Sequence, residues 1–152
     1  MFRRKNKTES GAPLSLIALD AEDLAVISAH LQDAVLKPAD IAWRPARGQL
    51  TLCVRRFDWA SPRLRPQRRL SAVHFTRVTR VVHKGVDLQA PALNLLAISF
   101  EPGEAPSGAL RLDFSGGGVI RAEAECIEAQ LKDLGPAWRA ARRPVHNPDG
   151  EL

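Results

Sequence analysis

The chain has 152 residues, 45% of them hydrophobic, which is typical of one globular domain. No apolar stretch approaches the roughly 20 residues of a membrane-spanning helix, and the basic N-terminus lacks the apolar core of a secretory signal, so we expect a cytoplasmic protein. The formal net charge of +5 is unevenly distributed, because residues 44–84 hold eleven Lys and Arg but one acid, Asp58. The segments on either side are net negative.

The chain is expected to begin with a short strand and a helix. Residues 1–13 are polar and charged, which predicts a flexible tail. Residues 14–20 are predicted to form a strand, and Asp20 has the character of a helix N-cap. A helix over residues 21–36 is predicted from the helical spacing of four apolar residues, Leu24, Ile27, Leu31 and Val35.

The middle of the chain has the apolar alternation of strands. Residues 50–59 are predicted to be a half-buried strand, with Leu50, Leu52 and Val54 on its core face. Residues 70–82 are rich in β-branched side chains, but their apolar phase changes near Arg77, which predicts a bulge or a break between two strands. Further strands are predicted at residues 93–100 and around Leu110, Leu112 and Phe114.

Three consecutive glycines, Gly116 to Gly118, lie between two predicted strands. The phosphate-binding patterns GxxxxGK[ST] and GxGxxG are absent and a short strand over residues 119–122 follows, so we expect a tight turn rather than a phosphate cradle. After this strand, a closing helix that ends at Gly135-Pro136 is predicted from the spacing of Ala124, Ile127, Leu131 and Leu134.

These elements favour an α+β fold in a single domain over residues 14–138. The expected architecture is a curved, mostly antiparallel sheet or partial barrel of roughly five to seven strands, with an N-terminal and a C-terminal helix packed on it. In the order of its elements this layout is similar to a pleckstrin-homology domain. Residues 139–152 are expected to form a second flexible tail.

No motif in the sequence indicates an enzyme, a metal site or a cofactor, and none is expected. The histidines, His30, His74, His83 and His146, do not have metal-ligand spacing. The two cysteines, Cys53 and Cys126, are isolated, and we expect both to be reduced. A small enzyme whose site is assembled around His74 from distant residues is therefore only the third hypothesis for function.

The strongest chemical signal is a cluster of arginines near two aromatic residues, Phe57 and Trp59. Guanidinium groups fit phosphates and carboxylates, and an aromatic ring can stack on a base. The candidate residues for binding a polyanion or a protein partner are Arg55, Arg56, Trp59, Arg63, Arg65, Arg68 and Arg69. The alternative is structural: the basic segment pairs with the acidic C-terminal third of the chain, and the aromatic residues lie in the core.

Three functional hypotheses follow from these patterns. The first is a non-enzymatic interaction or adaptor domain that uses a sheet edge or the arginine-rich loop to bind an acidic protein surface. The second is a module that binds RNA or another polyanion through residues 55–69. The third is the small enzyme. Neither the oligomeric state nor the identity of a partner is predicted by the sequence.

Several stretches of the sequence together resemble a known family. They are LIALDAEDLAVISAHLQDAV (16–35), RRFDW (55–59), HFTRV (74–78), LNLLAISFEP (93–102) and GGGVIRAEAECIEAQLKDLGPAW (116–138). With these motifs the chain resembles the domain-of-unknown-function 2948 family, small and mostly alphaproteobacterial proteins, over about residues 14–143. The resemblance implies a bacterial cytoplasmic protein, and it assigns no catalytic or binding residue.

Overall fold

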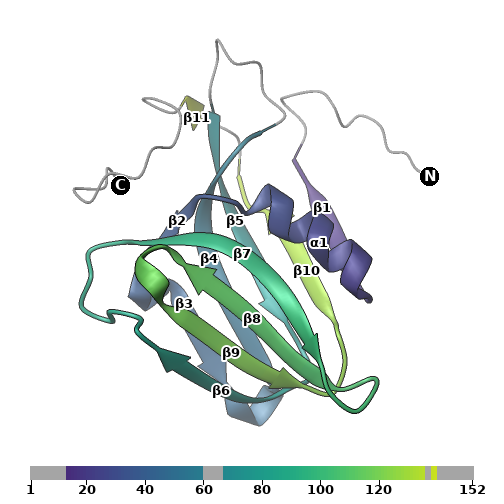
Figure 1. Cartoon of the computed structure of the whole chain (residues 1–152). Coiled ribbons are helices and arrows are strands. Elements are labelled where there is room, and N and C mark those ends of the chain that lie inside the picture. The colour runs from purple at the N-terminus through teal and green to yellow at the C-terminus, as the bar shows by residue number, and fades with distance from the viewer. Residues whose placement is uncertain (1–12, 60–66, 136–137, 140–152) are drawn as a thin grey trace.

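In the part of the chain that the computed structural model describes, a curled antiparallel sheet carries one α-helix near its rim (Figure 1). The structure describes residues 13–59, 67–135 and 138–139, the last two without their side chains. The predicted tails at residues 1–13 and 139–152 therefore lie almost entirely outside the described residues. No helix in the described ranges is long and apolar enough to cross a membrane.

Eleven strands of the sheet lie within the described residues, and the last of them has only two residues. Their order is β1-β10-β5-β4-β2-β7-β8-β9-β6, with β3 also paired to β4 and β11 to β5. The elements are β1 (Ser15–Ala18), α1 (Ala21–His30), β2 (Ala34–Leu36), β3 (Ile41–Arg44), β4 (Gln49–Phe57), β5 (Gln67–Phe75), β6 (Val78–Lys84), β7 (Leu93–Pro102), β8 (Gly108–Phe114), β9 (Val119–Ala124), β10 (Ala129–Asp133) and β11 (Trp138–Arg139), with three 3-10 turns at Pro38–Asp40, Pro45–Arg47 and Ser115–Gly117.

The fold is mostly β. The predicted antiparallel sheet and N-terminal helix are confirmed, but the prediction of five to seven strands and a C-terminal helix is wrong. The helix α1 begins as predicted, because the Asp20 side chain accepts a hydrogen bond of 2.8 Å from the backbone N–H of Asp23. It ends at His30, however, six residues before the predicted end. Asp33 adopts a left-handed conformation with φ of 65°, and the chain then enters β2, which pairs with β4 and β7.

The predicted closing helix is also wrong. Residues 119–124 and 129–133 form β9 and β10, and β10 has β1 on one side and β5 on the other. Two ladders of backbone hydrogen bonds therefore hold this segment extended, although its apolar spacing suits a helix. Leu131 is buried as expected, but Leu134 is 51% exposed. The predicted similarity to a pleckstrin-homology domain is also wrong, because it requires the closing helix.

The core lies inside the curl of the sheet. The predicted alternation is confirmed for β4, where Leu50, Leu52 and Val54 are buried on the inner face. Val73 and Phe75 of β5 continue this inner face across the pair β4–β5. The helix α1 packs against β7 and β1 through buried apolar residues, Leu24 and Ile27.

A corner between β5 and β6 makes the sheet curl. Arg77, at the predicted phase change, adopts a positive φ of 62° between the two strands. At the same corner, the backbone N–H of Thr76 donates to the carbonyl of Glu128, and that of Glu125 donates to the carbonyl of Arg77. The chain thus turns from the pair β5–β10 into the pair β6–β9. The predicted glycine turn is confirmed by the positive φ angles of Gly116 and Gly117 between β8 and β9.

Candidate binding face

Two of the candidate arginines lie inside the molecule. Arg56 of β4 and Arg69 of β5 are directly opposite each other in register, and each is only 1% exposed. They continue the inner face of Leu52 and Val54 toward the end of β4, where apolar side chains give way to charged ones. Two buried cations on adjacent strands require buried carboxylates nearby, because an unpaired buried charge is costly.

Asp133, the last residue of β10, neutralises Arg56. The Arg56 Nε and Nη2 atoms donate to its two carboxylate oxygens at 2.9 and 2.8 Å. The Ser71 hydroxyl and the backbone N–H of Leu14 donate to the same carboxylate at 2.6 and 2.7 Å. Burial alone would raise the pKa of Asp133, but these hydrogen bonds outweigh it and hold the pKa below its ordinary value.

Asp58 and His30 complete this buried ionic cluster, which we define as Arg56, Arg69, Asp58, Asp133 and Ser71 with His30 beside it. The Arg69 Nε donates to Asp58 at 3.1 Å and lies 3.8 Å from Asp133. Burial and, secondly, the charge of Arg56 lower the pKa of His30. The cluster joins β4, β5, β10 and the segment before β1, so its geometry indicates a structural role.

The structural alternative for the basic segment is supported by several ion pairs with the acidic C-terminal third. Besides Arg56 with Asp133, Arg77 lies 3.4 Å from Glu125, and Arg80 lies 3.7 Å from Glu123. Of the other candidate residues, Arg63 and Arg65 lie outside the described residues. Arg55, Arg68 and Trp59 are described, and they lie outside the buried cluster.

The remaining described candidate arginines, Arg55 and Arg68, lie on the outer face of the sheet, which we define as the outward side of β3, β4, β5, β10 and β1. Arg68 donates from Nη1 to the carbonyl of Arg55 at 3.0 Å, and its guanidinium lies 5.9 Å from the centroid of the Phe57 ring. Phe57 is buried, and it packs edge-on against Trp59 at 4.6 Å. The Trp59 indole N–H donates to the carbonyl of Gln32.

The outer face also carries large apolar side chains. Eight such side chains are exposed in the described part of the chain, and half of them belong to β1 and its C-terminal extension, β5 and the end of β10: Ile17 (62%), Leu19 (66%), Leu70 (40%) and Leu134 (51%). Leu70 and Leu134 are neighbours, because the backbone N–H of Leu134 donates to the carbonyl of Leu70 at 2.8 Å. The sequence predicts neither of these exposed leucines, because the helical spacing places Leu134 in the core and no pattern singles out Leu70.

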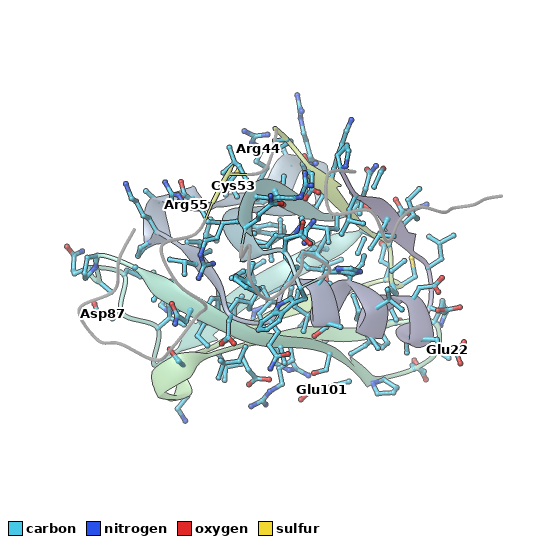
Figure 2. The ribbon with its side chains drawn as sticks, turned by 90° about the horizontal axis from the view of Figure 1, so that it is seen from above. Glu22, Arg44, Cys53, Arg55, Asp87 and Glu101 are labelled. Carbon is cyan, nitrogen blue, oxygen red and sulfur yellow. The ribbon has the colours of Figure 1, made fainter. Side chains whose placement is uncertain are left out.

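Two cations lie beside Leu70 and Leu134. Arg55 is opposite Leu70 in the β4–β5 register, and Lys132 precedes Leu134 by one outward-facing position on β10. Figure 2 shows Arg44, Cys53 and Arg55 on one side of the molecule, away from Glu22 and Glu101. Two acids lie at the ends of the described part of this face: Asp33 is near Arg68, and Glu128 is at the other end, near His74.

A groove of about 450 Å³ crosses the end of the outer face that is farthest from Arg55. His74, the histidine singled out in the sequence, lies in this groove on β5. Its Nδ1 atom is 3.0 Å from the Thr51 hydroxyl and 3.5 Å from the Gln49 amide nitrogen. The lining consists of Ile17, Leu19, Gln49, His74, Thr76, Glu128, Ala129 and Gln130.

Within the described ranges, no group of three or more His, Cys, Asp or Glu side chains is arranged to hold a metal ion. Cys53 and Cys126 are both free and half-buried. A sequence model of the family described as "Protein of unknown function (DUF2948)" matches residues 14–146. No curated protein and no solved structure matches the chain.

Proposed function

The chain belongs to the DUF2948 family, whose function is unknown, and we propose that it is a non-enzymatic cytoplasmic interaction domain. Its outer face binds a short, acidic segment of another protein that also contains apolar residues. This proposal corresponds to the first of the three hypotheses from the sequence. It differs from that hypothesis in placing the binding residues on a face of the sheet, whereas the hypothesis named a sheet edge or the arginine-rich loop.

The observation that carries the proposal is the set of exposed apolar side chains on one sheet face. Leu70 and Leu134 are 40% and 51% exposed, and they lie side by side on neighbouring strands. Contiguous exposed apolar surface rimmed by polar residues is characteristic of protein interaction sites. Burial of each leucine by a partner would contribute roughly 1 kcal/mol, since about half of each side chain is still exposed to water.

The charges of the outer face determine the chemistry of the partner. Arg55, Arg68 and Lys132 lie near the two leucines, and Arg44 lies at the groove end of the face, opposite Gln49. Among the described residues, the acids of the face are Asp33, near Arg68, and Glu128, in the groove. A segment with Asp or Glu beside its apolar residues is attracted by this arrangement, and a basic segment is repelled.

The size of the face favours a short segment over a second copy of the chain. Across the five strands of the face the width is about 19 Å, since neighbouring strands lie about 4.8 Å apart. Along a strand, four successive outward-facing residues span about 20 Å, so the area of the face is about 400 Å². A stable dimer buries roughly 800 Å² on each partner. An extended peptide of about eight residues, at roughly 3.3 Å per residue, is long enough to cross the face.

Binding of RNA is less well supported. Sequence-tolerant binding of single strands needs exposed aromatic rings on which bases stack. Phe57 is buried, and two arginines of the proposed patch, Arg56 and Arg69, are inside the ionic cluster. Among the described residues of the patch, Trp59, which is 38% exposed, is then the one aromatic ring left for a base to stack on.

The test is fluorescence anisotropy with a labelled synthetic peptide of about eight alternating Glu and Leu residues. A Lys-Leu peptide of the same length and a labelled single-stranded RNA are measured beside it, at two salt concentrations. We expect the Glu-Leu peptide to bind, its affinity to fall with salt, and the Lys-Leu peptide not to bind.

Two matched variants locate the site. Leu134→Asp places a carboxylate on the face and should weaken binding of the Glu-Leu peptide at least tenfold, or about 1.4 kcal/mol. Leu88→Asp changes a leucine of equal exposure, 51%, in the segment between β6 and β7, and should leave binding unchanged. Equal loss in both variants, or binding of the RNA in preference to the peptide, would contradict the proposal.

A further inference from the structure

The groove on the outer face combines apolar and hydrogen-bonding side chains. Near Leu70 and Leu134 the face offers apolar groups and cations, whereas the groove adds the hydrogen-bonding side chains His74, Glu128 and Gln130 to its apolar residues, Ile17 and Leu19. Its volume of about 450 Å³ is within the range of ordinary ligand pockets. A segment that crosses the face would therefore meet two different chemical environments.

The imidazole of His74 presents a hydrogen-bond donor to a ligand. Its Nδ1 atom faces the amide nitrogen of Gln49, which can only donate, and the hydroxyl of Thr51. When Nδ1 accepts from the Thr51 hydroxyl and the Gln49 amide, the ring proton is on Nε2, and Nε2 is then a donor. Nε2 has no hydrogen-bond partner among the described residues.

Glu128 supplies an acceptor and a negative charge. It is held in place by the Thr76 hydroxyl, which donates to one carboxylate oxygen. The other oxygen lies 3.9 Å from the Nε atom of Arg77, which also pairs with Glu125. Glu128 is the only carboxylate among the residues that line the groove. A second carboxylate beside it would be repelled, whereas a neutral group with an N–H would be bonded.

We infer that the groove binds the carboxamide side chain of an Asn or Gln in the docked segment. A primary amide has a carbonyl that accepts from His74 Nε2 and an N–H that donates to Glu128, so it satisfies both groups with no charge. This inference rests on the proposed function, because the rest of the segment is held by the outer face. It gives the domain a preference for an acidic segment that is interrupted by one neutral amide.

The test replaces one Glu at a time by Gln in the Glu-Leu peptide, with anisotropy as the readout. At one position the replacement should tighten binding about fivefold, and at the remaining positions it should weaken binding through lost charge. If every replacement weakens binding, the groove does not select an amide and the inference fails, although the proposed function stands.

Variants of the groove then separate its two contacts. Glu128→Gln should remove the preference, so that Glu and Gln bind equally at that position, while the matched variant Glu125→Gln should retain it. His74→Ala should lower the affinity of the Gln peptide about fivefold, and His83→Ala, an exposed histidine on β6, should not. Retention of the preference in Glu128→Gln would overturn the assignment. Each variant is first compared with the wild type by thermal melting.

A direct readout keeps the two proposals distinguishable. Backbone amide NMR signals are recorded while N-acetylglutamine amide, and separately N-acetylglutamate, are added at millimolar concentration. The glutamine compound should shift the signals of His74, Glu128 and Gln130 more than the glutamate compound does. The absence of any shift there refutes the inference. The absence of binding by every peptide, with the groove signals shifted by the amide, refutes the proposed function instead.

Discussion

Substitution of Asp133 by Asn should strongly destabilise the fold, because this carboxylate neutralises a buried arginine. Asp133 accepts four hydrogen bonds, two of them from Arg56, and its side chain is completely buried. Asparagine keeps the shape but removes the charge and replaces one acceptor oxygen with a donor. Removal of one partner from a buried ion pair costs about 3–5 kcal/mol.

Urea denaturation followed by tryptophan fluorescence measures this effect. With a urea dependence of about 2 kcal/mol per molar, a loss of about 4 kcal/mol lowers the midpoint by about 2 M. Asp113→Asn is the matched control, since Asp113 pairs with Arg111 at 3.0 Å near the surface and should contribute at most about 1 kcal/mol. A midpoint for Asp133→Asn equal to that of this control would refute the reasoning.

The same variant changes the response to acid. The pKa of Asp133 is lowered in the folded state, while in the unfolded chain it is near the ordinary value of about 3.9. Below that pH the unfolded state takes up a proton that the folded state does not, so the stabilisation is lost as pH falls toward the folded pKa. The stability curves of the wild type and Asp133→Asn should therefore approach each other between about pH 5 and pH 2.

Three further substitutions test the fold. The pKa of His30 is lowered in the folded state, so as the pH falls the unfolded state takes up a proton before the folded state does. The free energy of unfolding should therefore decrease below about pH 6.5. His30→Gln should flatten this decrease in urea titrations between about pH 7 and pH 5. Leu131→Asp buries an unpaired charge and should cost several kcal/mol in a thermal melt, whereas Leu134→Asp, at an exposed site, should melt within a few degrees of the wild type. Gly48→Ala places a Cβ 2.9 Å from a backbone carbonyl at φ of 59° and should cost about 1–3 kcal/mol, in contrast to Gly135→Ala, where no atom lies within 4 Å.

The strands of the middle of the chain could be predicted because their pattern is local. Alternation of apolar residues identified the inner face of β4 correctly, and the phase change at Arg77 correctly located the corner between β5 and β6. The glycine turn between β8 and β9 was predictable for the same reason. Each of these features depends on the order of a few consecutive residues, so it can be predicted from a single sequence.

The errors at β2 and β10 have a common physical cause. Both segments have apolar residues at helical spacing, and both are held extended by pairing with strands that are distant in the sequence, as in the register of Leu131 with Val73. Such pairing cannot be inferred from local periodicity, and it outweighs helix propensity.

The candidate site was partly predictable. Arg56 has the same parity as Leu52 and Val54, a signal that it faces inward, but its partner Asp133 had been assigned to a helix, so the ion pair could not be foreseen. The exposed pair of Leu70 and Leu134 depends on the register between β5 and β10 and is not visible in the sequence. Arg55 and Arg68 lie on the outer face, and their role in binding stays a prediction.

The most direct test of binding at the outer face is an NMR map of the backbone amides with the Glu-Leu peptide added. We predict that the largest shifts occur in β5 and β10, at Leu70, Lys132 and Leu134, and that they decrease at high salt. Shifts centred on β6, β8 or β9, or none at peptide concentrations up to about 1 mM, equivalent to a binding free energy weaker than about −4.1 kcal/mol, would contradict the account.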